Sequence, residues 1–129
     1  MLRSTLMAAF LTFAVVPTAS SAIADSLSGS WAGSGSVRYG DTRERASCRA
    51  RYSRIGGTSY TMNAQCATPS GRVDQSATLN RVGKNRYAGS FYNSQFGVTG
   101  SIFVVLRGRS MSVSLSSAGG TGSFKMRRR

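Results

Sequence analysis

Apolar and polar residues alternate one by one along most of the chain, and this period of two is the feature that most limits how it can fold. From residue 45 to residue 52, alanine, cysteine and tyrosine alternate with arginine and serine. In a β-strand, such alternation places every apolar side chain on one face. Beyond residue 24, no window of eleven residues holds the i, i+3, i+4, i+7 apolar pattern of an amphipathic helix. We therefore predict an all-β chain whose strands each bury one face.

Short turn sequences divide this alternating chain into eight segments. Each of the seven turns contains glycine, a residue that tolerates the backbone conformations of tight turns. They fall at residues 39–42, 56–57, 68–71, 83–85, 93–97, 108–109 and 118–120. Connections this short join neighbouring antiparallel strands. The pattern indicates an up-and-down meander.

A recurring Gly-Ser-apolar tripeptide indicates that the sheet is strongly curved. In each copy the glycine and the large residue face the same side, so the glycine leaves room for a bend that its neighbour covers. The copies are residues 29–31, 89–91, 100–102 and 122–124. Closing the sheet also removes two exposed edges. We expect a small antiparallel eight-stranded up-and-down barrel, with a flattened sandwich as the alternative.

The first 24 residues have the features of a secretory signal peptide. Arg3 precedes an apolar stretch at residues 6–16, and Ala22-Ile23-Ala24 is a suitable cleavage site. No cysteine follows the cleavage point to carry a lipid, and no later apolar run approaches the about 20 residues that a membrane helix needs. We expect residues 25–129 to form a single barrel domain with a short basic C-terminal tail, without a transmembrane segment, in the periplasm or secreted.

Two cysteines test the predicted strand pairing. Cys48 and Cys66 lie nine residues on either side of Gly57, so a hairpin that turns there places them opposite each other. The same register pairs Tyr52 with Met62. An even number of cysteines in an exported protein favours a disulfide, which would stabilise the fold by about 3 kcal/mol through loop closure. A redox-active pair is the alternative, but the Cys-x-x-Cys spacing is absent.

Composition excludes most kinds of catalysis. The chain has no histidine, so Ser-His-Asp and Cys-His triads and histidine-ligated zinc are ruled out. Only four carboxylates are present, and no glycine-rich phosphate loop precedes a helix. A general base of suitable pKa is therefore lacking. We expect no catalytic residues, no cofactor and no metal.

Arginine dominates the charge of the chain, whose net value is +13. Arg45, Arg49 and Arg51 share the polar face of one predicted strand, and Arg38 belongs to the strand before it. Arginine binds phosphates and carboxylates through a planar fork that stays charged. An anionic partner is favoured over a basic surface that serves solubility alone. The candidate anion-binding residues are Arg38, Arg45, Arg49, Arg51, Arg127, Arg128 and Arg129, the last three as a flexible tail.

The predicted interior is rich in aromatic residues, and Gln75 is its one clearly polar member. An eight-stranded barrel is just wide enough to be filled by side chains or to hold one small ligand. We favour a packed core, and a ligand cavity remains the alternative. The predicted inward aromatics are Trp31, Tyr39, Tyr52, Tyr60, Tyr87, Phe91 and Phe124. The candidate residues for a ligand inside the barrel are Trp31, Tyr52, Tyr60, Gln75 and Tyr87.

The predicted exterior is polar almost throughout and lacks the apolar belt of an outer-membrane barrel. The exception is the strand near residues 98–106, where Phe103 and Val105 face outward. Two such side chains could pack against a partner or a second copy of the chain, although isolated exposed apolar residues are common.

Four segments carry distinctive motifs: Gly29-Ser30-Trp31-x-Gly33-x-Gly35, Glu44-Arg45-x-x-Cys48-Arg49-Ala50-x-Tyr52, Cys66-Ala67-Thr68-x-Ser70-Gly71 and Asn85-Arg86-Tyr87-x-Gly89-x-Phe91-Tyr92-Asn93. With these motifs the chain resembles a family of small exported alpha-proteobacterial proteins. The resemblance covers most of residues 25–129, implies a bacterial envelope protein and supplies no catalytic residues. The opening Gly-x-Trp also resembles calycin-type barrels: lipocalins, avidins and barrel inhibitors of bacterial proteases.

These observations favour a non-enzymatic exported binding module that engages an anionic envelope polymer or an acidic protein through its arginine-rich outer face. The alternative is a calycin-type carrier of a small ligand, or an inhibitor of an exported protease, that uses the mouth of the barrel. Nucleic acid is disfavoured because the protein is exported and its aromatics mostly face inward. An enzyme ranks third.

Overall fold

The computed structural model of the protein describes residues 9–15 and 27–129. Residues 9–15 belong to no helix or strand. The expected cleavage site at Ala22–Ala24 and most of the predicted signal peptide lie outside the described residues. None of the described segments forms a helix long and apolar enough to cross a membrane.

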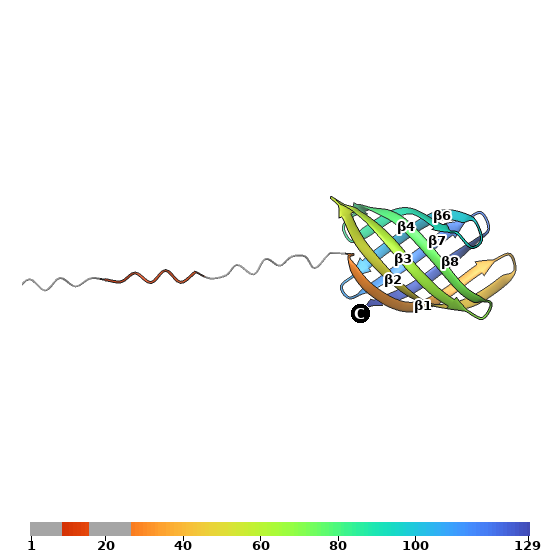
Figure 1. The fold of residues 1–129 in the computed structure, drawn as a ribbon, viewed down its shortest axis with the longest axis horizontal. Helices are drawn as coiled ribbons and strands as arrows, with labels where there is room; N and C mark the ends of the chain where they lie inside the picture. Colours follow the sequence, from red (N-terminus) through yellow and green to blue (C-terminus); the bar gives the residue numbers. More distant parts are fainter. Residues whose placement is uncertain (1–8, 16–26) are drawn as a thin grey trace, which may run out of the picture.

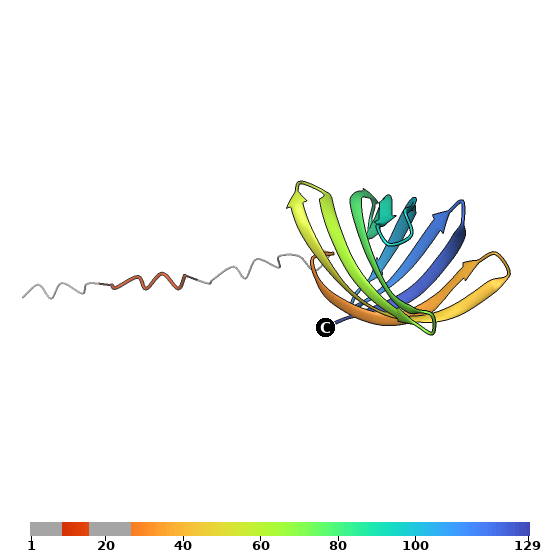
Figure 2. The same cartoon turned by 45° about the vertical axis from the view of Figure 1, so that its right-hand side comes forward.

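Eight antiparallel strands form a closed barrel in which each strand pairs with its neighbours in the chain (Figures 1 and 2). They are β1 (Gly29–Tyr39), β2 (Thr42–Gly56), β3 (Ser59–Thr68), β4 (Gly71–Gly83), β5 (Arg86–Asn93), β6 (Val98–Arg107), β7 (Ser110–Ser117) and β8 (Gly120–Arg128). Pairing of β1 with β8 closes the ring. The predicted all-β up-and-down barrel is confirmed, and the sandwich alternative is wrong.

The closure depends on two glycines of β1, because the backbone of β8 comes very close to this strand. A Cβ atom on Gly35 would lie 1.9 Å from the carbonyl oxygen of Ser123, and one on Gly33 would lie 2.0 Å from that of Lys125. The predicted tripeptide shows the same crowding at Gly89, where a Cβ atom would lie 1.8 Å from the Thr78 oxygen. Glycine therefore permits the sharp bends that a small barrel requires.

Replacing Gly35→Ala should destabilise the barrel by about 3 kcal/mol, because the new methyl group has no space unless β1 and β8 separate. Chemical denaturation would measure this change. Gly119→Ala is the matched control, since its Cβ would meet no atom within 4 Å. Equal stability of the two variants would contradict this account of closure.

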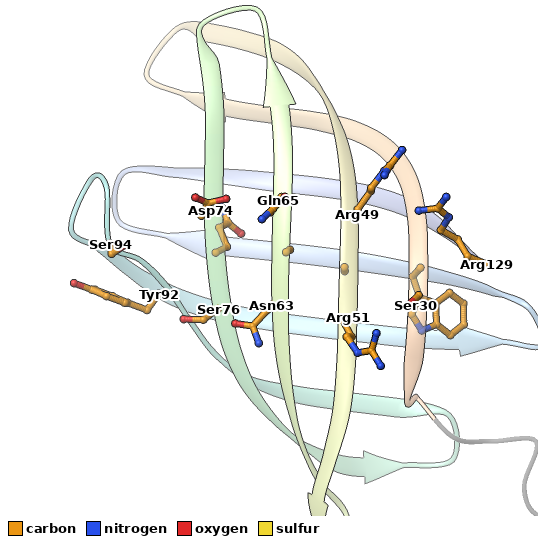
Figure 3. Close-up of a pocket in the computed structure, with 14 residues that line it drawn as sticks. Ser30, Arg49, Arg51, Asn63, Gln65, Asp74, Ser76, Tyr92, Ser94 and Arg129 are labelled. Carbon is orange, nitrogen blue, oxygen red and sulfur yellow. The ribbon is translucent and has the colours of Figure 1, made fainter.

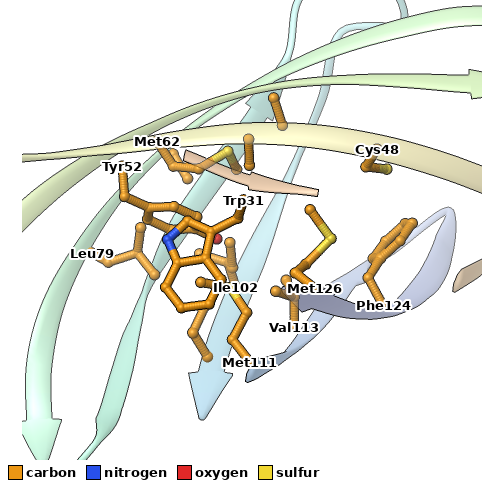
Figure 4. Packing of buried hydrophobic residues seen from close by; sticks show 14 of the residues in the cluster. Trp31, Cys48, Tyr52, Met62, Leu79, Ile102, Met111, Val113, Phe124 and Met126 are labelled. Carbon is orange, nitrogen blue, oxygen red and sulfur yellow. The ribbon is translucent and has the colours of Figure 1, made fainter. Parts of the chain in front are cut away.

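Side chains on the inward faces fill the barrel (Figure 4). Trp31, Leu79 and Val104 are completely buried, and the void found among the core side chains measures only about 30 Å³. The structure therefore supports a packed core over a preformed ligand cavity. Cys48 and Cys66 lie opposite each other on β2 and β3 and form the predicted disulfide.

Two expectations differ from the structure. The alternation predicts an inward-facing Tyr39, but this residue is 43% exposed because it ends β1 beyond the core, where its hydroxyl donates a hydrogen bond to Glu44. The prediction of a flexible basic tail at the C-terminus is also wrong. Instead, β8 continues through Arg128, because its pairing with β1 and β7 extends to the last residues.

Candidate functional site

A hollow of about 560 Å³ lies on the outer face of the barrel over β1 to β5 (Figure 3). Strand register explains its lining, because outward residues of neighbouring strands stand side by side in rows. In one row Arg51 lies between Ser30 and Asn63, and in the next Arg49 is paired with Gln65. The hollow thus combines guanidinium groups with side-chain amides.

Three arginines border this hollow: Arg49, Arg51 and Arg129. Within the described part of the chain, the guanidinium groups of Arg49 and Arg51 have no hydrogen bond or ion pair. The backbone N–H of Arg129 donates to the carbonyl oxygen of Ser30 over 2.9 Å, which fixes the chain end beside the row that holds Arg51. Three positive groups are therefore available to a ligand.

The far side of the hollow is formed by β4 and β5. Asp74 belongs to this side and is paired with Arg72 at 3.4 Å, so its negative charge is already offset. Tyr92 also lies here, and its ring is 47% exposed. The positive charge is thus concentrated over β1 and β2, as Figure 3 shows.

The other predicted anion-binding arginines lie elsewhere. Arg38 and Arg45 face outward near the β1–β2 turn, where Arg38 stands opposite Arg43. Arg127 is exposed on β8, across Ala32 from Arg49 but outside the hollow's lining. Spacing along the chain assigns these arginines to outward faces, whereas strand register decides which of them are neighbours.

The predicted site residues do not include six others that line the hollow: the amides Asn63 and Gln65, the carboxylate Asp74, the aromatic Tyr92, and the hydroxyls Ser76 and Ser94. The alternation in the segment 59–68 already places Asn63 and Gln65 on an outward face. What it does not show is that both stand directly opposite arginines of the preceding strand.

Arg128 has a different surrounding from its neighbours. Its guanidinium lies 4.3 Å from the centre of the Trp31 ring and donates a 2.7 Å hydrogen bond to the carbonyl oxygen of Ser28. The indole N–H of Trp31 in turn donates to the carbonyl oxygen of Leu27 at 3.1 Å. These contacts join the start of β1 to the last residues of β8, and they cover one end of the core.

Arg128→Ala should lower the free energy of unfolding by about 1 to 2 kcal/mol, because a cation–π contact and a charged hydrogen bond are lost. Trp31 is the only tryptophan of the chain, so its fluorescence reports this site directly. We expect stronger acrylamide quenching in the variant. Arg127→Ala is the matched control and should leave both quantities unchanged; a loss of protection in both variants would show that Arg128 has no special role.

Candidate acid–base groups in the structure are few. Hydrogen bonds from Ser70 and Tyr39 hold the pKa of Glu44 below its ordinary value, so this carboxylate is a weak base. The bond to Glu44 raises the pKa of Tyr39, and burial raises that of Tyr52, so both phenols stay neutral. Among the described residues, no group of three histidine, cysteine or acidic side chains could hold a metal ion.

The residues predicted to bind a ligand inside the barrel belong mainly to the core. Trp31 and Tyr52 are buried, and the rings of Tyr60 and Tyr87 meet edge to face with centroids 5.4 Å apart. Gln75 is half-buried and borders both the small internal void and the outer hollow. Four of the five residues are therefore buried in the core, and Gln75 alone of this set is partly exposed.

Comparison with protein-family models finds no match, and neither does comparison with curated proteins. Among solved structures, a de novo designed fluorescence-activating β-barrel matches with a TM-score of 0.64 and 17% identity, over 82% of this chain and 96% of its own. A redesigned β-barrel bound to DFHBI, mFAP1, matches with a TM-score of 0.67 and 10% identity, over 82% and 97%. These likenesses show the closed eight-stranded barrel fold.

Proposed function

We propose that this protein is an exported, non-enzymatic binding module that holds an anionic component of the bacterial envelope, or an acidic protein, in the hollow over β1 to β5. The observation that carries the proposal is the convergence of Arg49, Arg51 and Arg129 on one hollow. The features of residues 1–24, and the resemblance to small exported alpha-proteobacterial proteins, are the reasons for an envelope partner.

The lining of the hollow supports this proposal. Guanidinium forks bind the oxygens of phosphate or carboxylate groups in pairs, and charged hydrogen bonds of this kind are stronger than neutral ones. Asn63 and Gln65 beside them offer amide N–H donors to the same oxygens. The excess of sixteen bases over four acids in residues 25–129 would also attract an anion from a distance.

Binding of inorganic tripolyphosphate, a short anionic probe, to the chain from residue 25 onward tests the site. The double variant Arg49→Ser/Arg51→Ser should bind at least about tenfold more weakly by calorimetry, because each arginine contributes charged hydrogen bonds. Binding by the unaltered chain should weaken steeply as salt is added.

Lys84→Ser/Arg86→Ser removes the same charge at the far end of β4 and β5, and serves as the control. It should change the affinity by less than about twofold. An equal loss in both double variants would show that only net charge matters and would contradict a site in the hollow.

The interior of the barrel is the second candidate site, for a small ligand carried in the calycin manner or for inhibition of an exported protease at the barrel mouth. The specific observation is the likeness to a redesigned barrel that holds DFHBI. Against it, ligand pockets usually measure about 300 to 1,000 Å³, whereas the internal void here is about 30 Å³.

DFHBI itself is a suitable probe of the interior. Because side chains fill the barrel, we expect no saturable rise in DFHBI fluorescence with the chain from residue 25 onward. A saturable rise that Gln75→Ala abolishes would show that the core opens for a ligand and would favour the carrier. Salt-resistant inhibition of an exported protease would favour the inhibitor.

A further inference from the structure

The two ends of the barrel differ in charge. Because the strands run up and down, the β2–β3, β4–β5 and β6–β7 turns share one end, here called the basic end (Figure 1). The acids of the described residues, Asp41, Glu44 and Asp74, lie at or near the opposite end. The turns of the basic end carry Arg54, Arg81, Lys84, Arg86, Arg107 and Arg109. Within the described residues, this end is uniformly positive.

Two similar β-bulges lie at the basic end. The register of β2 with β3 shifts between Arg54 and Gly56, and that of β4 with β5 shifts between Arg81 and Gly83. Both sites have the sequence Arg-apolar-Gly. In both, Nε of the arginine donates to a backbone carbonyl oxygen close by: Arg54 to Gly57 at 2.7 Å, and Arg81 to Gly83 at 3.2 Å.

The extra residues of these bulges are Ile55 and Val82, whose side chains are 59% and 60% exposed. Bulges typically re-aim side chains and are specific features of a fold. A hydrogen bond joins the β2–β3 hairpin to the β4–β5 hairpin: the backbone N–H of Arg81 donates to the carbonyl oxygen of Thr58 at 3.0 Å. Two apolar side chains therefore project from the same end, each next to an arginine.

We propose that the basic end docks on an anionic lipid bilayer, with Ile55 and Val82 entering the interfacial region and the surrounding bases binding the lipid phosphates. Apolar side chains ringed by lysine and arginine suit this boundary, because the bilayer buries the apolar groups while its anionic headgroups attract the bases. The uniform positive charge of this end distinguishes a lipid surface from a partner of mixed charge.

None of the residues named for the basic end lines the hollow. Arg49 and Arg51 lie within β2, away from its bulge, and their partners are on its lateral face. Phe103 is also exposed, at 40%, but its neighbours across the strands are Ala88 and Ser114 rather than bases. It therefore provides a control for exposed apolar area without the surrounding charge.

Sedimentation with vesicles tests the proposal. The chain from residue 25 onward contains every strand of the closed barrel, and its use avoids the apolar stretch at residues 6–16. We expect binding to vesicles of phosphatidylglycerol and phosphatidylethanolamine, and none to phosphatidylcholine alone. Ile55→Ser/Val82→Ser and Lys84→Ser/Arg86→Ser should each weaken the binding at least tenfold, whereas Phe103→Ser should not change it.

A gain of signal provides a second measurement. Ile55→Trp places an indole at the exposed bulge, and its fluorescence should shift to shorter wavelength on binding anionic vesicles. Phe103→Trp, on the outer face of β6 opposite Ala88, should show no shift.

Other outcomes separate this inference from the proposed function. If Arg49→Ser/Arg51→Ser abolishes vesicle binding while Ile55→Ser/Val82→Ser does not affect it, the lipid headgroups bind in the hollow and docking by the basic end is wrong. If Lys84→Ser/Arg86→Ser loses vesicle binding but Ile55→Ser/Val82→Ser keeps it, attraction between the bases and the lipid phosphates alone explains the binding, and the inference is likewise overturned. Tripolyphosphate binding in the hollow is unaffected by either result.

Discussion

The close contact between β1 and β8 is the constraint on which the rest of the structure depends. It exists because Gly33 and Gly35 present no side chain to the carbonyl oxygens of β8. Once the ring closes there, Arg128 lies over Trp31 and the backbone of Arg129 is bonded to Ser30. A basic C-terminus that would otherwise be a free tail thereby becomes part of the barrel wall, and one of its arginines reaches the hollow.

Because side chains fill the interior, a binding site is expected on the outside of the barrel. The inward faces combine large aromatics with alanines and the Cys48–Cys66 disulfide, and together they leave a void of about 30 Å³. Close packing of this kind stabilises a small domain but leaves no room for a typical ligand. On the outer face, in contrast, Arg49 and Arg51 have guanidinium groups without a hydrogen bond or ion pair among the described residues, and a ligand could neutralise them without disturbing the core.

The exterior offers two positive surfaces of different chemistry. The hollow combines arginines with Asn63 and Gln65 and suits the oxygens of an anionic group. The basic end adds Ile55 and Val82 to its charge and suits a boundary between polar and apolar phases. A protein with both could hold an anionic molecule while resting on an anionic surface. The two roles depend on different residues, so each can fail without the other.

The sequence by itself determined the strand number, the faces of the strands and the cysteine pairing. These follow from local rules, because alternation assigns faces and the spacing around Gly57 sets the register of one hairpin. Tertiary structure decided which outward residues meet, because a row across strands combines residues far apart in the chain. It also decided that Tyr39 lies beyond the core and that Arg128 covers the end of it. Only closure of the ring brings the C-terminus beside β1. The alternation of residues along the chain does not encode this contact between its first and last strands.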